Sequence, residues 1–157
     1  MPKVFNAMFL FIVLVSFSAC KKSSPTPPAP TYNNFKINAV TIGQISYSTS
    51  WDIGSDPDVY FNIEDASGAV LYDGSTTYIT DVPSSQLPFA WTLSSPYIVP
   101  NTTTTYYVAI YDADTPFSAD DLIGKVAFKI DDLKTGYLTT ATITSGTNSI
   151  SFTGTWY

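Results

Sequence analysis

The sequence predicts an all-β domain, an eight-stranded antiparallel β-sandwich, that follows a cleaved leader and a proline-rich linker. From Tyr32 to Tyr157, short apolar or alternating runs recur between Gly, Pro, Asp and Asn residues, and no helical periodicity persists. Aromatic and β-branched residues, which pack well on pleated sheets, are abundant in this region. The region is long enough for one domain with one core and too short for two.

The individual strands follow from these runs. We expect eight or nine short strands, with candidates near residues 35–42, 59–63, 69–72, 76–79, 89–93, 104–111, 126–130, 140–143 and 149–156. Alternate residues such as Val108 and Ile110 then face the space between two sheets. The dipeptides Ser67-Gly68 and Asp73-Gly74 lie between strand-like runs, and their glycines are expected to supply the positive φ of tight hairpins.

Residues 1–19 have the pattern of a signal peptide, with Lys3 near the start, an apolar run over residues 7–15 and small residues before Cys20. The run is shorter than the roughly 20 apolar residues of a membrane-spanning helix. Phe17-Ser18-Ala19-Cys20 resembles the lipobox of bacterial lipoproteins. The resemblance implies that Cys20 becomes the N-terminus and carries fatty acyl chains such as palmitate, which hold the protein on a membrane of the bacterial cell envelope. We expect the outer membrane, on its periplasmic or surface face; an ordinary secretory leader and a retained helical anchor are the alternatives.

Residues 20–31 form the expected linker between this anchor and the domain of residues 32–157. The segment KKSSPTPPAPT, residues 21–31, holds four prolines among small polar residues, a composition typical of an extended polyproline-type spacer. At about 3.1 Å per residue it reaches roughly 34 Å. Cys20 is the only cysteine, so the chain forms no internal disulfide.

Charge and composition exclude several functions. Residues 32–157 contain thirteen acidic residues and four lysines, a formal charge of −9, which argues against nucleic-acid binding. The chain has no histidine and no arginine, and Glu64 is its single glutamate. Serine triads, thiol chemistry and the usual zinc sites are therefore excluded, and we do not expect an enzyme.

Two acidic segments stand out, WDIGSDPDVY at residues 51–60 and YDADTPFSADDLIG at residues 111–124. Two carboxylates about 4 Å apart repel by roughly 4 kcal/mol at an effective dielectric of about 20, so crowded aspartates favour a bound cation. A sandwich gathers its loops at its ends, where these aspartates could ligate one or two calcium ions, each with about six to eight oxygen ligands. The candidate ligands are Asp52, Asp56, Asp58, Asp112, Asp114, Asp120 and Asp121. The alternative is that they are solvated turn residues.

The same segments resemble the C2 domain, a calcium-dependent β-sandwich. The matching motifs are Ser55-Asp56-Pro57-Asp58-Val59, Asp112-Ala113-Asp114, Asp121-Leu122-Ile123-Gly124, Leu87-Pro88-Phe89-Ala90-Trp91 and Val108-Ala109-Ile110-Tyr111. The resemblance implies that Asp52 and Asp56 are ligands from the first loop. It also implies that Asp112, Asp114 and either Asp120 or Asp121 are ligands from the third loop of such domains. Asp121 is favoured by its three-residue distance from Gly124.

In that family, calcium lets the acidic end of the sandwich accept anionic lipid while apolar loop tips enter the bilayer. The resemblance therefore implies membrane contact by Pro116 and Phe117, which stand at such a tip; packing of Phe117 against its own loop is the alternative. The strand region over residues 70–80 contains no lysine for phosphoinositides. We therefore expect a lipid-anchored calcium-binding module whose acidic loops bind anionic lipid, a protein or a glycan. The competing hypothesis is a metal-free structural, interaction or glycan-binding sandwich.

Overall fold

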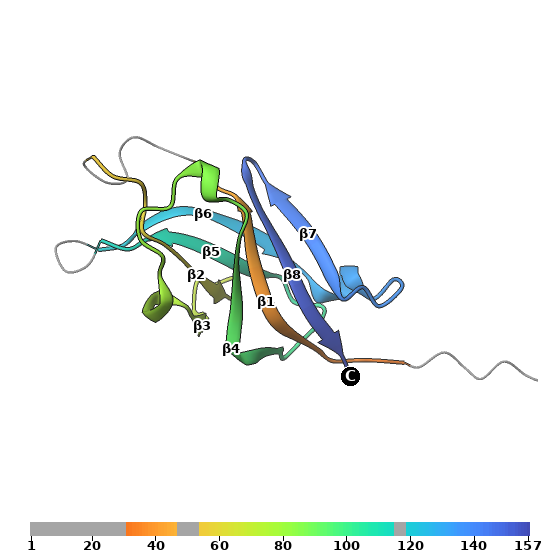
Figure 1. Cartoon of the computed structure of the whole chain (residues 1–157). Helices are drawn as coiled ribbons and strands as arrows, with labels where there is room; N and C mark the ends of the chain where they lie inside the picture. Colours follow the sequence, from red (N-terminus) through yellow and green to blue (C-terminus); the bar gives the residue numbers. More distant parts are fainter. Residues whose placement is uncertain (1–30, 47–53, 115–118) are drawn as a thin grey trace, which may run out of the picture. The chain divides into compact units, whose positions relative to one another are not determined.

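The computed structural model describes residues 31–46, 54–114 and 119–157, and Thr31–Tyr157 forms one compact unit. Eight strands make two four-stranded antiparallel sheets, as the sequence predicts (Figure 1). The first sheet has the order β4-β1-β8-β7, formed by Phe89–Val99, Phe35–Gln44, Asn148–Trp156 and Thr140–Ser145. The second has the order β3-β2-β5-β6, formed by Val70–Asp73, Val59–Glu64, Tyr106–Asp112 and Asp121–Phe128.

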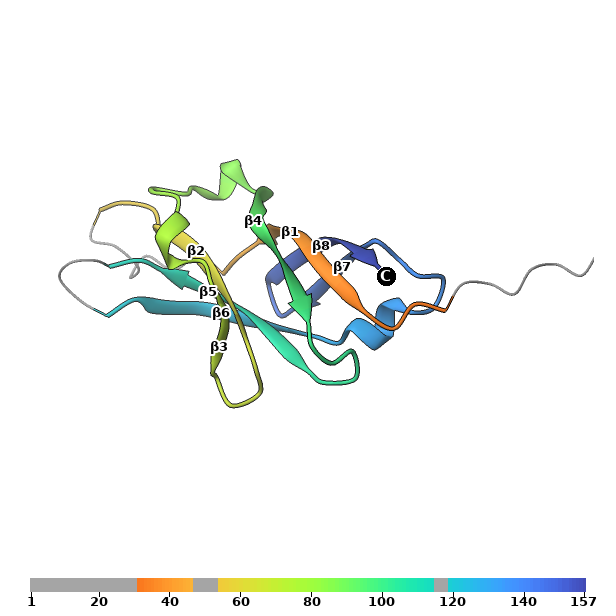
Figure 2. The same cartoon turned by 90° about the horizontal axis from the view of Figure 1, so that it is seen from below.

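Three short 3-10 helices, η1 (Ser75–Thr77), η2 (Ser84–Gln86) and η3 (Ile130–Leu133), connect strands at the edges of the sandwich. Figure 2 shows the same layers from below, with β1, β7 and β8 on one side and β2, β5 and β6 on the other. None of the helices within the described ranges is long and apolar enough to cross a bilayer.

The core fills the space between the two sheets with side chains from alternate strand positions. Val108 and Ile110 of β5 are both fully buried in it, which confirms their predicted inward direction. Phe61 of β2 packs against Trp91 of β4 in an edge-to-face arrangement, and the rings of Phe128 and Phe152 lie 4.5 Å apart across the two sheets. Burial of such large apolar side chains contributes about 1.5–3 kcal/mol each before entropic costs.

The predicted strand over residues 76–79 is wrong, because this segment is the helix η1 followed by a single bridge between Ile79 and Val59. Gly74 is also not a positive-φ hairpin residue, since its φ is −99°. A Cβ atom at Gly74 would lie 2.2 Å from the carbonyl oxygen of Phe61, so glycine is needed here for close backbone approach. Gly68, with φ +85°, does serve the β2–β3 hairpin as predicted.

Two further strands are longer than predicted: β4 continues to Val99 rather than ending near residue 93, and β6 begins at Asp121 rather than near residue 126. The difference in β6 affects the acidic segment. The first residues of β6 pair with the end of β5, where Asp112 lies opposite Asp121. The strand has little alternation at its start, because Asp121 and Leu122 are both exposed. Pairing with β5 therefore overrides a weak local pattern.

The termini of the domain lie together at one end of the sandwich. Asn34 and Tyr157 exchange two backbone hydrogen bonds, of 3.3 and 3.1 Å. Tyr32 donates its backbone N–H to the hydroxyl of Tyr137, and the two rings pack edge to face. Tyr137 in turn packs against Trp156. We call this end, defined by Tyr32, Phe35, Tyr137 and Trp156, the terminal pole.

Candidate metal site at the acidic pole

The second sheet brings the two acidic segments together at the other end of the sandwich. β2 starts where β5 ends, with Val59 opposite Asp112, and β6 starts opposite the same residue. The chain segments before β2, after β5 and before β6 are therefore neighbours. We call this end the acidic pole; its hydrogen-bonded members are Asp58, Asp112, Asp114 and Asp120.

Asp112 and Asp58 link the two segments directly. The Oδ1 atom of Asp112, a fully buried residue, accepts a 2.7 Å hydrogen bond from the backbone N–H of Asp58. The backbone carbonyl of Asp58 accepts a 2.8 Å hydrogen bond from the N–H of Ala113. The side chain of Asp58 accepts another, 2.8 Å long, from the N–H of Asp81, which has a positive φ of 51°. Three loops are thus joined around two carboxylates.

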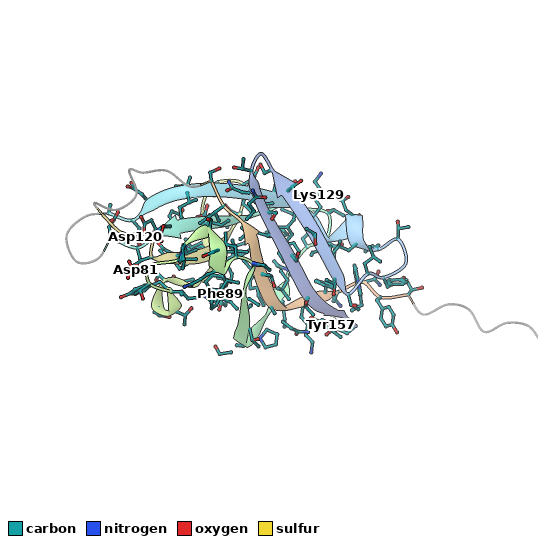
Figure 3. All side chains as sticks on the ribbon, turned by 45° about the horizontal axis from the view of Figure 1, so that its top comes forward. Asp81, Phe89, Asp120, Lys129 and Tyr157 are labelled. Atoms are coloured by element: carbon teal, nitrogen blue, oxygen red, sulfur yellow. The ribbon has the colours of Figure 1, made fainter. Side chains whose placement is uncertain are left out.

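Asp120 is held in place from two sides. Its Oδ1 atom accepts a 3.1 Å hydrogen bond from the backbone N–H of Asp114, and its Oδ2 atom accepts a 2.6 Å hydrogen bond from the hydroxyl of Tyr60. Figure 3 shows Asp120 and Asp81 at the same end of the domain. The first bond closes the base of the loop between β5 and β6, and the second ties that loop to β2.

A polar network continues from Tyr60 across the sheet. The rings of Tyr60 and Tyr111 are stacked with centroids 5.2 Å apart. The hydroxyl of Tyr111 donates a 2.7 Å hydrogen bond to the buried carboxylate of Glu64, which also forms an ion pair with Lys125. Burial and the hydrogen bond to Glu64 raise the pKa of Tyr111 to about 12. Burial, together with the hydrogen bond to Asp120 and its charge, also raises the pKa of Tyr60.

The remaining candidate residues are placed differently. Asp56 and Asp121 are exposed, Asp56 just before β2 and Asp121 at the first position of β6. The resemblance to C2 domains favoured Asp121 because of its distance from Gly124. The side chain of Asp121 is exposed, however, whereas that of Asp120 is half-buried. The other predicted site residues, Asp52, Cys20, Pro116 and Phe117, lie outside the described residues.

The donor chemistry at this pole fits a calcium ion. All of its candidate side chains are carboxylates, and oxygen donors of this kind suit hard cations such as Ca²⁺. An ionised carboxylate has about four lone-pair positions, so an oxygen that accepts one N–H can still ligate a metal. Within residues 31–46, 54–114 and 119–157, no three acidic side chains form a ready metal-binding group. A complete coordination sphere therefore needs further ligands or a movement of the loops.

Sequence reasoning missed Tyr60, Tyr111 and Asp81 as neighbours of this pole. Tyr60 lies between the core-facing Val59 and Phe61 of β2, and Tyr111 follows the core-facing Ile110 of β5, so that alternation could have placed both tyrosines on the outer face. It could not have shown which carboxylate their hydroxyls contact. Nothing in the local sequence marks Asp81, because its contact with Asp58 depends on the loop after η1.

Comparisons with known proteins agree with the topology. Neither a protein-family model nor a curated protein sequence matches the chain. Among solved structures, human GIVD cytosolic phospholipase A2 in complex with methyl gamma-linolenyl fluorophosphonate inhibitor and terbium chloride matches with a TM-score of 0.54 and 18% identity, covering 79% of this chain and 17% of that one. A further structure of the same human enzyme matches with a TM-score of 0.53 and 16% identity, covering 80% and 17%.

The chain thus spans 17% of the length of these phospholipase structures. A third match, a structure of a C2 domain, has a TM-score of 0.51 and 15% identity, and covers 80% of this chain and 98% of that one. At identities of 15–18%, these matches establish the fold alone. They do not assign the activity of the larger enzyme to this chain. The compact unit Thr31–Tyr157 therefore has a C2-like fold.

Proposed function

We propose that this chain is a lipid-anchored protein of the bacterial cell envelope whose C2-like domain binds calcium at its acidic pole. Through that pole it engages a membrane or protein partner. The observation that supports this most is the convergence of Asp58, Asp112, Asp114 and Asp120, which come from segments far apart in the sequence, at one end of the sandwich. A C2-like fold is itself suggestive of a membrane-binding or calcium-binding module.

Calcium would offset the repulsion among these carboxylates. Asp112 and Asp120 would serve as ligands that are already oriented, because hydrogen bonds from Asp58, Asp114 and Tyr60 hold them. Asp52 and Asp56, from the first acidic segment, would be further ligands of the ion. Backbone carbonyls or water would supply the remaining oxygens. Extracellular modules bind calcium with dissociation constants of about 10⁻⁴ to 10⁻³ M, and we expect this range.

The anchor rests on the lipobox at Cys20. Each buried methylene of an acyl chain contributes about 0.8 kcal/mol, so two or three chains would hold the protein on a membrane permanently. Proximity to a membrane then needs no calcium. Calcium would instead control what the acidic pole binds, and Phe117 would add about 1.5–3 kcal/mol if it entered lipid.

A second candidate function is a metal-free interaction or glycan-binding sandwich. Its support is that oxygens of Asp58, Asp112 and Asp120 already accept hydrogen bonds from the protein. Such bonds let the loops close without an ion. In this case the acidic pole would be a fixed negative surface, and calcium would change neither stability nor binding.

Terbium luminescence distinguishes the two functions. Terbium is a hard trivalent cation that can replace calcium, and its emission is sensitised by nearby tyrosines, here Tyr60 and Tyr111. We expect emission that saturates with added terbium, falls when calcium is added in excess, and is weaker in Asp112→Asn. Emission that is absent, or unchanged by both calcium and Asp112→Asn, would favour the metal-free function.

A further inference from the structure

The strand β7 differs from the other three edge strands of the domain. β3 is four residues long and ends in Asp73, β4 contains Pro96, and β6 carries Asp121 and Lys125. Short length, proline and charge keep an edge strand from pairing with another chain. β7 has the sequence TATITS, without proline or charge, and its register with β8 continues without a shift. Figure 1 shows β7 at the free edge of its sheet, beside β8.

The backbone of β7 offers hydrogen-bonding groups along this free edge. Directly before the strand, the N–H of Gly154 donates a 2.8 Å hydrogen bond to the carbonyl oxygen of Thr139. Bonded pairs alternate along an antiparallel ladder, so the odd-numbered residues of β7 bond to β8 and the even-numbered residues face the free edge. The even-numbered residues are Thr140, Thr142 and Thr144, and all three are exposed. An added antiparallel strand could bond to each of them.

The sequence of β7 is complementary to itself about Thr142. If the β7 strands of two copies paired antiparallel around a two-fold axis at this residue, Thr142 would lie opposite Thr142 of the second copy. Thr140 would lie opposite Thr144, and Ala141 opposite Ile143. Hydroxyl groups would then meet on the outer face, and the apolar side chains that pack on the core would meet on the inner face. Cross-strand pairs of matching character stabilise a sheet.

The residues just beyond β7 also match in this register. Leu138, two residues before the strand, is a large apolar side chain that is 48% exposed. It would lie opposite Gly146 of the second copy, in the two-residue turn between β7 and β8. A Cβ atom at Gly146 would meet no atom within 4 Å, so the space around this turn is open. Pairing of the two strands would therefore cover an exposed leucine.

The distribution of charge permits two copies to meet at this edge. The domain has a formal charge of −9, yet the four strands of this sheet, all among the described residues, contain no Asp or Glu and one lysine, Lys36. β7 runs from Tyr137 of the terminal pole toward Asn148, which contacts Gly124 near the acidic pole. Antiparallel pairing would thus place the two acidic poles at opposite ends of the dimer, where their repulsion is weakest.

We propose that two copies of this chain associate through β7, which pairs antiparallel with β7 of the second copy. The two β4-β1-β8-β7 sheets then form one continuous sheet of eight strands. The paired segments are short, so the interface is smaller than the about 1,200 Å² of standard interfaces, and the dimer is weak and forms as the protein concentration rises. The association needs neither calcium nor the anchor, because β7 contains no carboxylate.

Sedimentation velocity of the protein from residue 20 to residue 157 tests this proposal over a series of concentrations, with chelator and with a reductant that keeps Cys20 as a thiol. We expect the wild-type protein to change from monomer to dimer. Thr142→Lys should remain monomeric throughout, because two like charges would lie opposite each other at the axis. Thr92→Lys, at an exposed position of the other edge strand β4, is the matched control and should dimerise like the wild type.

A mixture of two charge variants tests the register. Thr142→Asp should be monomeric alone, whereas an equal mixture with Thr142→Lys should restore the dimer, because opposite charges meet only if residue 142 lies opposite itself. Wild-type protein that is monomeric at every concentration would overturn the proposal and leave this edge to a strand of another protein. Dimers that persist in Thr142→Lys, or a mixture that stays monomeric, would overturn the pairing of β7 about Thr142.

Discussion

The hydroxyl of Tyr60 donates a 2.6 Å hydrogen bond to the Oδ2 atom of Asp120, across 60 residues of sequence. Tyr60 lies on β2, whereas Asp120 lies in the loop directly before β6. The same carboxylate accepts the N–H of Asp114 from the other side of this loop. One aspartate therefore connects β2 to both arms of the loop between β5 and β6.

Substitution Tyr60→Phe removes this hydroxyl and keeps the ring stacked on Tyr111. Hydrogen bonds to charged groups contribute about 1.5–3 kcal/mol, so we expect a loss of this size in the free energy of unfolding, measured with urea. We also expect weaker calcium binding in calorimetry, because Asp120 loses its orientation. Tyr78→Phe, on a tyrosine that is 43% exposed, is the control and should change neither quantity. Calcium affinity unchanged in Tyr60→Phe would contradict a role in positioning Asp120.

Two neighbouring aspartates can be compared directly. Asp120 is half-buried and hydrogen-bonded at the acidic pole, whereas Asp121 is exposed at the start of β6. We expect Asp120→Asn to weaken calcium binding more than Asp121→Asn, because an amide supplies one neutral oxygen and less charge. The measurement is a calcium titration of both variants by calorimetry. The reverse order would show that the spacing to Gly124 selects the ligand.

Alkaline pH should destabilise the domain through Tyr60 and Tyr111. Both tyrosines have a raised pKa in the folded state, to about 12 for Tyr111, against 10.0 for an ordinary tyrosine. Between these values the unfolded chain has lost a proton that the folded chain retains, so the free energy of unfolding falls as the pH rises above 10. Below pH 10 this contribution is fully present.

Urea unfolding at a series of pH values from 9 to about 12 measures this slope. We expect a shallower slope in Tyr111→Phe, and an ultraviolet titration in which some of the eleven tyrosines ionise late. If all tyrosines ionise together near pH 10 while the domain stays folded, the network between Asp120 and Lys125 does not exist in solution.

Gly74→Ala tests the packing of β2 against η1. The added methyl group would lie 2.2 Å from the carbonyl oxygen of Phe61, and backbone atoms cannot move aside as a side chain can. Overpacking costs typically about 1–3 kcal/mol, and we expect a loss of at least this size in urea unfolding. Gly68→Ala is a useful comparison, because its Cβ meets no atom within 4 Å and only its φ of +85° opposes the change. Equal stability of wild type and Gly74→Ala would contradict this close approach.

The all-β class, the two-sheet arrangement and the convergence of two acidic segments could all be predicted from the sequence. The alternation of side-chain direction along β5 identified Val108 and Ile110 as inward-facing residues, because every second side chain of a strand lies on the same face of the sheet. The same reasoning failed for residues 76–79, where a short β-rich run became η1. Tertiary contacts of Gly74 with Phe61 determine that segment, and local propensity does not reveal them.

The site was less predictable than the fold. Aspartates could be recognised by their crowding, whereas their partners Tyr60 and Asp81 could not, since hydrogen bonds between distant segments depend on the strand register. The pairing of β5 with β6 shifts register between Ile110 and Tyr111 and then continues to Asp112 and Asp121, which exposes Asp121 and leaves Asp120 beside Tyr60. A one-residue change in that register would exchange the two aspartates.

The most direct test of a calcium site at the acidic pole is thermal unfolding of the protein from residue 20 to residue 157, with calcium and with chelator. At a calcium concentration about a hundred times the dissociation constant, binding adds about 2.7 kcal/mol, which predicts a midpoint raised by roughly 5–15 °C. The increase should disappear in Asp112→Asn. Identical midpoints for the wild-type protein in millimolar calcium and in chelator would contradict the site.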